Sequence, residues 1–231
     1  MIQEELGRPA AELFAAIEHT PVAAASLAQV HRATLANGTS VAVKIMYPSL
    51  RKDVASDFSV LRTMAGQIKP GGFDLSWLVN DLEEALAMEM DFTREARNAE
   101  ASAARLAHMA PAVKVPRVLW EHTTEGILTM EFVPGLIKLS DGAALARAAL
   151  DPREVGELVA TTFAEMALCH GHVHGDPHAG NIYVRARQDP AGSRGVRPQL
   201  VLLDHGLYHA AAPRPDIRPA SGLRTAGPPA R

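Results

Sequence analysis

Residues 174–181 read His-Gly-Asp-Pro-His-Ala-Gly-Asn, and this octapeptide constrains the chain more than any other segment. It lies between a run with helical periodicity and a short predicted strand, so it is expected to form a loop on a rigid scaffold. Asp176 is placed to accept a proton or orient a nucleophile, and Asn181 can bind a metal ion through its amide oxygen. Phosphoryl transfer needs both roles. A turn so rich in polar side chains has little structural purpose, which favours a functional loop.

Zinc binding is the alternative interpretation of the same loop. His172, His174 and His178 are spaced closely enough to share a metal ion. No further set of ligands nearby completes a tetrahedral zinc site, so phosphoryl transfer remains the favoured interpretation.

A lysine ends the second of two predicted strands. Val41-Ala42-Val43-Lys44 closes a run that follows Asn37-Gly38, and an Asn-Gly pair is the strongest short signal for a hairpin. From this position Lys44 can reach a nucleotide phosphate. An apolar strand that ends in a solvated lysine is commonplace, so Lys44 alone also fits an ordinary strand end.

Two further acidic positions extend the pattern. Glu95 lies four residues after Asp91 on a predicted helix. There it can hold Lys44 by charge pairing, as protein kinases require. The alternative is that these acidic residues form a solvated face of the helix. Asp204, in Leu-Asp-His-Gly after an apolar strand, can coordinate magnesium, although an ordinary strand-end turn also fits. These elements follow the order found in protein kinases: a lysine, a helix glutamate, an Asp-x4-Asn loop and an Asp-x-Gly at a strand end.

Periodicity and turn residues predict the secondary structure. A helix broken at Pro9 is expected at 2–18, and a long helix at 74–109 is expected to carry an apolar stripe with Glu89 as its one charge. The other expected helices span 49–68 and 151–170, and the expected strands span 27–35, 40–46, 113–121, 126–133, 182–185 and 199–203. Loops are expected at 69–72 and 188–198, and a disordered tail rich in Pro, Ala and Arg from Ala210.

Composition excludes several classes of protein. The 231 residues are 47% apolar and 21% charged, as in an ordinary globular protein. The net charge of −3 gives no basis for nucleic-acid binding, and the single cysteine, Cys169, excludes an intramolecular disulfide. No apolar run approaches the ~20 residues needed to span a bilayer. The acidic start, MIQEEL, is unlike a targeting peptide, so targeting information is expected to be absent or to lie upstream.

Three motifs in register carry a resemblance to a known family. They are the alanine-rich segment at 21–31, Glu-x-Asp-Phe-x-x-Glu-Ala-x-Asn at 89–98 and His-Gly-Asp-Pro-His-x-x-Asn at 174–181. Together they resemble the AarF/UbiB atypical kinases over roughly residues 1–209, and Asp-His-Gly-Leu-Tyr at 204–208 is similar to the fifth animal paralogue. The resemblance implies an α+β, protein-kinase-like two-lobe fold, with an antiparallel N-lobe sheet, inserted helices and an incomplete helical C-lobe.

The resemblance also implies a domain division and a set of roles. The N-lobe is expected at 1–133, a partial C-lobe at 134–209 and the tail at 210–231. Lys44 would contact the phosphates of ATP or ADP and pair with Glu95, and Asp176 would be the catalytic aspartate. Asn181 and Asp204 would hold Mg²⁺. The nucleotide would further meet Ala23, Ala24, Ala25, Ser26, the gatekeeper Met130 and the hinge residues Glu131 and Val133.

Two departures from the family pattern leave other functions open. The Lys-x-Gly-Gln segment that normally faces Glu89 and Asp91 is absent, and the tail stands where further C-lobe helices are expected, so we expect a chain truncated at both ends. The resemblance implies a mitochondrial kinase or ATPase linked to lipid or quinone homeostasis. A non-catalytic binding module or pseudokinase is the alternative. A small-molecule phosphotransferase of the aminoglycoside or choline type shares the octapeptide, but the alanine-rich and acidic motifs argue against it.

Overall fold

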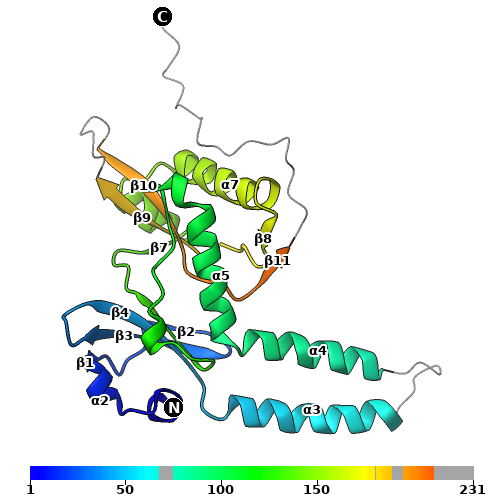
Figure 1. Ribbon diagram of the computed structural model, residues 1–231. Helices are drawn as coiled ribbons and strands as arrows, with labels where there is room; N and C mark the ends of the chain where they lie inside the picture. Colours follow the sequence, from blue (N-terminus) through cyan, green and yellow to red (C-terminus); the bar gives the residue numbers. More distant parts are fainter. Residues whose placement is uncertain (68–74, 180, 189–194, 211–231) are drawn as a thin grey trace, which may run out of the picture. The chain divides into compact units, whose positions relative to one another are not determined.

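The structure is a computed structural model that describes residues 1–231 apart from 68–74, 180, 189–194 and 211–231 (Figure 1). The predicted break at 69–72 therefore lies outside the described residues. So does the tail predicted from Ala210, apart from Ala210 itself, which is the last residue of strand β11 (Tyr208–Ala210). The chain divides into two compact units, the first made of Met1–Ala96 with Val118–Phe132, and the second of Arg97–Arg117 with the chain from Val133 onward. The division falls inside helix α5, Phe92–Arg105.

An antiparallel sheet organises the first unit. Its strands are β1 (Phe14–Ile17), β2 (Ala23–Ala24), β3 (Ala28–Leu35), β4 (Ser40–Met46) and β6 (Ile127–Glu131). The described strands pair in the order β1-β3-β4-β6, and β2 pairs with β3. Asn37-Gly38 makes the predicted turn, because Gly38 has a φ of 83°, in the left-handed region that glycine favours, and the Asn37 side chain accepts from the Thr39 amide.

Along β4, the buried valines and Lys44 lie on opposite faces of the sheet. Val41 and Val43 are fully buried, and they pack with Leu13, Phe14, Ala33, Leu35 and Ile127. Because side chains alternate along a strand, Lys44 points to the face opposite Val41 and Val43. The sheet thus presents its lysine away from its own apolar core.

The expected helix at 2–18 is wrong in its second half. The chain forms α1 (Ile2–Leu6), α2 (Ala10–Leu13) and then strand β1, in which Phe14 pairs with Leu35 and Ile17 with Ala33. Phe14 is 3% exposed in the sheet core. Pairing with β3 therefore overrides the helical periodicity of this short segment.

The expected long helix at 74–109 is also wrong, because it is broken at Met90-Asp91. Helix α4 (Ser76–Glu89) ends there, α5 begins at Phe92, and a 3₁₀ turn follows at Ala107–Met109. Asp91 Oδ1 accepts from the Thr93 amide at 2.9 Å, as an N-cap does, and the Phe92 amide donates to the Glu125 carbonyl at 3.0 Å. Asp91 therefore starts a new helix.

The break divides the expected apolar stripe. On α5, Phe92, Ala96 and Ala99 are buried as expected, and so is Leu106 directly after the helix, whereas Ala103 is exposed. On α4, Leu78 and Leu82 are 40% and 53% exposed, and Glu89 is exposed. Instead, α4 packs on α3 (Leu50–Gln67) through a small cluster formed by Phe58, Ala65 and Val79, with Leu86 at its edge.

A second sheet and a long helix form the second unit. The strands are β5 (Val113–Lys114), β7 (Ile137–Lys138), β9 (Ile182–Gln188) and β10 (Val196–Leu202), in the order β5-β10-β9-β7. Helix α7 (Pro152–Leu168) begins as predicted, because Asp151 caps the Arg153 amide at 2.9 Å and proline suits a first turn. Val155 and Met166 of α7 share an apolar core with Leu200 and Leu202 of β10.

Several expected boundaries in the second half of the chain are corrected. The expected strand at 113–121 is reduced to β5, a bridge between Val118 and Met130, and a 3₁₀ turn at Trp120–His122. Strands β9 and β10 extend into the predicted 188–198 loop. Helix α6 (Gly142–Arg147) and the antiparallel pair β8 (His172–His174) and β11 (Tyr208–Ala210) were not expected. No helix among the described residues has the length and apolar character to span a bilayer.

Candidate functional site

A buried ion pair joins β4 to α5 in the first unit. Lys44 Nζ lies 2.7 Å from Oε2 and 2.9 Å from Oε1 of Glu95, so the ammonium group donates to both carboxylate oxygens. The Glu95 side chain is 4% exposed and that of Lys44 19% exposed. Charges withdrawn this far from water are retained only with a close partner, so the predicted contact between these residues is present as a strong ion pair.

The ring of Phe92 contacts the charged end of Lys44. Lys44 Nζ lies 4.9 Å from the Phe92 ring centroid, within the range of a cation–π contact, and Phe92 is 1% exposed. Phe92 and Glu95 are three residues apart on α5, so helical geometry brings both to one side of the helix. Phe92 belongs to the motif at 89–98, but this contact was not predicted.

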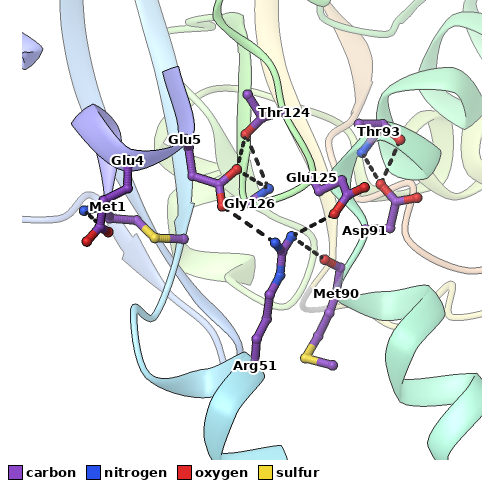
Figure 2. Close-up of polar contacts among 10 residues, drawn as sticks. All are labelled: Met1, Glu4, Glu5, Arg51, Met90, Asp91, Thr93, Thr124, Glu125 and Gly126. Carbon is purple, nitrogen blue, oxygen red and sulfur yellow. Dashed lines mark hydrogen bonds and ion pairs between the residues drawn. The ribbon is translucent and has the colours of Figure 1, made fainter. Parts of the chain in front are cut away.

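A polar network fastens the start of α5 within the same unit (Figure 2). Arg51, at the start of α3, lies 3.5 Å from Glu5 of α1 and 3.5 Å from Glu125, and donates to the Met90 carbonyl at 3.4 Å. Glu5 Oε2 also accepts from Thr124 Oγ1 at 2.7 Å. Arg51 thus holds the Met90 carbonyl just before α5, and Glu5 and Glu125 hold Arg51 in turn.

The alanine-rich segment forms a turn on the edge of the first sheet. Ala23 and Ala24 pair with Val30 and Gln29 of β3, and the Ala25 amide donates to the Ala28 carbonyl at 2.8 Å. Residues 22–26 are exposed. Small side chains on an exposed turn leave the backbone accessible to a ligand.

The expected hinge residues lie at the end of β6. Met130 pairs with Ala42 and is 8% exposed, and Glu131 pairs with Val41. Val133 follows at 4% exposed, and Gly135 has a φ of 73°, in the left-handed region that glycine favours.

The predicted catalytic loop follows β8 in the second unit. Asn181 Nδ2 donates to Asp176 Oδ2 at 3.1 Å, and His178 Nε2 lies 3.6 Å from the same oxygen. Asp176 and His178 are exposed, and Asn181 is half-buried. Because the Asn181 amide nitrogen faces a carboxylate, its Oδ1 atom is the end of the amide that can meet a cation.

His174 links the catalytic loop to the segment that contains Asp204. Its Nε2 lies 2.9 Å from the Asp204 carbonyl oxygen, and its Nδ1 accepts from the Asp176 amide at 3.1 Å. A carbonyl only accepts and an amide only donates, so the proton of this ring is on Nε2. His174 is 7% exposed, and it holds the backbone of both predicted functional aspartates.

Asp204 and Asn181 offer the kinds of oxygen atom that a hard cation prefers. Asp204 Oδ1 accepts from the Gly206 amide at 3.0 Å, which orients the carboxylate. A carboxylate and an amide oxygen, from Asp204 and Asn181, are ligands that Mg²⁺ prefers. His172 and His174, considered above for zinc, instead direct their Nε2 atoms to Ser102 Oγ and the Asp204 carbonyl.

Gly175 lies where the catalytic loop touches the segment after Asp204. Its amide donates to the Leu207 carbonyl at 2.8 Å. A Cβ atom at position 175 would lie 2.5 Å from Leu207 Cγ and 3.2 Å from His209 Cδ2. The two segments therefore meet closely enough that only glycine fits here without a shift.

Several residues beside the predicted site were missed. Asn98 and Ser102, on the later turns of α5, donate to the His205 carbonyl at 2.9 Å and to the Tyr208 hydroxyl at 3.2 Å. The spacing of Asn98 from Glu95, three residues along a helix, was a signal for Asn98. Ser102 gave no such signal, because its contacts lie far away in sequence.

Burial suppresses ionisation around Tyr208. Desolvation lowers the pKa of His205 to about 4 and that of His172 to about 4, with a smaller effect of the same sign on His172 from Arg105. Burial raises the pKa of Tyr208 to about 12, opposed by the hydrogen bond from Ser102. These three rings are therefore neutral near pH 7.

These motifs on this fold define an atypical kinase-like protein. The model of the ABC1 atypical kinase-like domain matches residues 1–218, which is most of the chain. The chain belongs to this family.

Individual relatives agree with this assignment. The chain is 38% identical over 210 residues to AarF domain-containing protein kinase 1 of Mus musculus, a match that covers 90% of this chain and 39% of that protein. It is 41% identical over 218 residues to an uncharacterised protein of Mycobacterium tuberculosis, covering 91% of this chain and 42% of the relative. The chain thus spans about two fifths of the length of these relatives. Similarity of 204–208 to the fifth paralogue stays a prediction.

A solved structure has the same fold. The complex of Rv3197 with erythromycin from Mycobacterium tuberculosis superposes with a TM-score of 0.68 at 30% identity, covering 93% of this chain and 51% of that one. The α+β, protein-kinase-like fold with an antiparallel N-lobe sheet, which the resemblance implied, is confirmed.

Proposed function

We propose that this chain binds ATP or ADP together with Mg²⁺ and acts as an atypical kinase or ATPase. The observation that carries the proposal is the Lys44–Glu95 ion pair at 2.7 Å, formed between residues 51 positions apart and almost withdrawn from water. Protein kinases require a strand lysine and a helix glutamate joined in this way. Membership of the ABC1 family supports the same chemistry.

Each site residue has a role in the proposal. Lys44, held by Glu95, would contact the nucleotide phosphates. The exposed backbone of residues 23–26 would cover them, with Glu131 and Val133 at the adenine. In the second unit Asn181 and Asp204 would hold Mg²⁺, which would neutralise phosphate charge, and Asp176 would accept the proton of the attacking hydroxyl.

Nucleotide binding can be measured directly. A fluorescent ADP analogue is titrated into the protein with and without Mg²⁺, and thermal shifts with ATP are recorded in parallel, since a ligand of the folded state stabilises by RT ln(1 + [L]/Kd). We expect affinity that depends on Mg²⁺. Lys44→Met/Glu95→Gln should weaken binding without leaving a buried charge, and Asp204→Asn should remove the magnesium dependence.

The matched control is Lys138→Met, at an exposed lysine on β7. Wild-type affinity in the Lys44→Met/Glu95→Gln variant would rule out the proposed phosphate contact. A folded wild-type chain with no affinity for nucleotide would instead favour the non-catalytic binding module. Turnover of an amino-alcohol or aminoglycoside would favour the small-molecule phosphotransferase.

The cellular role follows from the family resemblance and is a separate proposal. We propose a link to lipid or quinone homeostasis, with a mitochondrial location if the source is eukaryotic. A bacterial relative with 41% identity shows that the family is not confined to organisms with mitochondria. Quinone levels measured after gene deletion, with rescue by the wild-type gene but not by an Asp204→Asn allele, would test the link. Unchanged quinone and lipid profiles would refute it.

A further inference from the structure

Tyr208 is the centre of a hydrogen-bonded cluster that the proposed nucleotide chemistry does not use. Its ring stacks on His172 with centroids 4.1 Å apart, and it lies almost parallel to His205 at 5.7 Å. Its hydroxyl is 3.2 Å from Ser102 Oγ and 2.9 Å from His205 Nδ1. All four residues belong to the second unit.

The direction of these hydrogen bonds follows from His205. Its Nε2 lies 3.1 Å from the Leu202 carbonyl oxygen, and a carbonyl can only accept, so the proton is on Nε2. The neutral ring then has its lone pair on Nδ1, which must accept from the Tyr208 hydroxyl. His205 is 2% exposed, so water does not compete for either ring nitrogen.

The remaining bonds are then determined in turn. The Tyr208 proton is engaged by His205, so the Tyr208 oxygen accepts from Ser102 Oγ. The Ser102 proton is engaged by Tyr208, so Ser102 Oγ accepts from Nε2 of His172 at 3.1 Å. A single chain of donation thus runs from His172 through Ser102, Tyr208 and His205 to the Leu202 carbonyl.

Two members of this chain of donation, Leu202 and His205, flank Asp204 in the sequence. Leu202 lies two residues before Asp204, and His205 follows it directly. The His205 carbonyl accepts from Asn98 Nδ2 at 2.9 Å, so its backbone is held as well as its ring. The Asp204 carboxylate is oriented in turn by the Gly206 amide at 3.0 Å. The orientation of this carboxylate therefore depends on a fixed His205.

We propose that Tyr208 is a positioning residue. Its hydroxyl locks the His205 ring in one orientation and so holds the backbone around Asp204 with the carboxylate set for a magnesium–nucleotide complex. The metal-binding role of Asp204 belongs to the function proposed above, and the inference rests on it. The orientation of the carboxylate itself is a property of the protein alone and can be tested without nucleotide.

The hydroxyl is specific to this role because its removal leaves two unsatisfied groups. Tyr208→Phe keeps the stacked ring. It removes the oxygen that accepts the hydrogen bond from Ser102, a fully buried residue, and the hydroxyl proton that is donated to His205. A buried polar group without a partner costs more than the lost bond. The His205 ring would therefore turn away from Leu202 to find another partner, and the Asp204 backbone would lose its support.

The first test compares Tyr208→Phe with Tyr183→Phe, which removes a hydroxyl from β9 of the same unit. Hydrogen exchange is measured at the Gly206 amide, which donates to Asp204, and at the Leu200 amide, which donates to Ala112 at 2.8 Å. We expect exchange at Gly206, relative to Leu200, to become about tenfold faster in Tyr208→Phe only. An unchanged ratio would overturn the proposal.

A measurement on the wild-type chain keeps the proposal testable even if Tyr208→Phe does not fold. Nitrogen NMR shifts distinguish the two neutral histidine tautomers. We expect a proton on Nε2 and none on Nδ1 for both His205 and His172. A proton on Nδ1 of His205 would show that Tyr208 does not donate to it, and would refute the positioning role.

The second test separates this proposal from the proposed function. ATP affinity is measured over a series of Mg²⁺ concentrations for the wild type and both tyrosine variants. Tyr208→Phe should raise the Mg²⁺ concentration at half-maximal affinity about tenfold, as for other residues that orient a metal ligand, with unchanged affinity for Mg²⁺-free ADP. Wild-type Mg²⁺ dependence in Tyr208→Phe would contradict the proposal. No magnesium-dependent affinity in the wild type would refute the proposed function, and amide exchange would still decide whether Tyr208 orients Asp204.

Discussion

Lys44 Nζ lies within 2.9 Å of both carboxylate oxygens of Glu95, although the two residues are 51 positions apart. The carboxylate is 4% exposed. A charge this deeply buried depends on its partner, so the pair couples the position of α5 to that of β4. Its removal has consequences for stability that are separate from ligand binding.

Breaking this pair from one side should destabilise the protein more than removing it altogether. Lys44→Met leaves the Glu95 carboxylate buried without its cation, and we expect a loss of about 2–3 kcal/mol, at the lower end for such pairs because Lys44 is partly exposed. Lys44→Met/Glu95→Leu should recover most of this loss. Urea unfolding of the two variants tests the difference. A double variant as unstable as Lys44→Met would show that the unpaired charge is not the cause.

The cap at Asp91 predicts a second effect on stability. Asp91→Ala removes the acceptor of the Thr93 amide and of Thr93 Oγ1, at 2.9 and 2.6 Å, and should cost about 1 kcal/mol. Asp91→Asn can still cap the helix and should cost much less. Thermal unfolding of the two variants is the measurement. Equal losses would mean that the negative charge of Asp91, rather than its capping bond, is what matters.

The network around Arg51 should be dominated by Glu5 rather than by the arginine. Arg51 is 39% exposed and its contacts are 3.4–3.5 Å long, so Arg51→Ala should cost less than about 1 kcal/mol. Glu5→Ala should cost about 1–2 kcal/mol, because Thr124 Oγ1 and the Gly126 amide both donate to it. Arg62→Ala, which breaks the pair with Glu83, is the control for an exposed arginine. The prediction fails if Arg51→Ala proves the more damaging change.

Acid should destabilise the second unit through His205. Its pKa in the folded protein is about 4, below its ordinary value of 6.5, so the unfolded chain binds more protons between these two pH values. The contribution of His205 to the free energy of unfolding is therefore fully present above pH ~6.5. It falls by about 3 kcal/mol as the pH drops towards 4. His172 contributes in the same direction.

Chemical denaturation from pH 7.5 to 4.5, in the presence of a chelator, measures this dependence. His205→Phe should flatten the decline of unfolding free energy with falling pH, while His19→Gln, at an exposed site, serves as the control. An unchanged slope in His205→Phe would show that the acid sensitivity has another origin.

The parts of the fold that were predicted correctly depend on local chemistry. The Asn37-Gly38 turn and the start of α7 at Asp151-Pro152 are determined by residues adjacent in sequence. Strand β1 was missed because its conformation depends on pairing with Leu35, which periodicity within 2–18 does not report. The helix break was missed because an aspartate at a cap and an aspartate on a solvated face look the same in sequence.

In the candidate site too, some residues could be predicted from the sequence and others could not. Lys44, Glu95, Asp176, Asn181 and Asp204 were predicted because phosphoryl transfer requires those residue types in that order. Ser102 was not predicted, since its contact with Tyr208 joins residues 106 positions apart and Ser102 itself belongs to none of the motifs. Side chains that support a site are defined by the folded contacts alone.

The close approach at Gly175 has a consequence for the evolution of this family. Because Leu207 occupies the space that a side chain at position 175 would need, the two positions are not free to vary independently. Substitutions there should appear as compensated pairs among homologues, with a larger residue at 175 tolerated only where 207 has become small. The loop that contains Asp176 and the segment that follows Asp204 would then be inherited as one module.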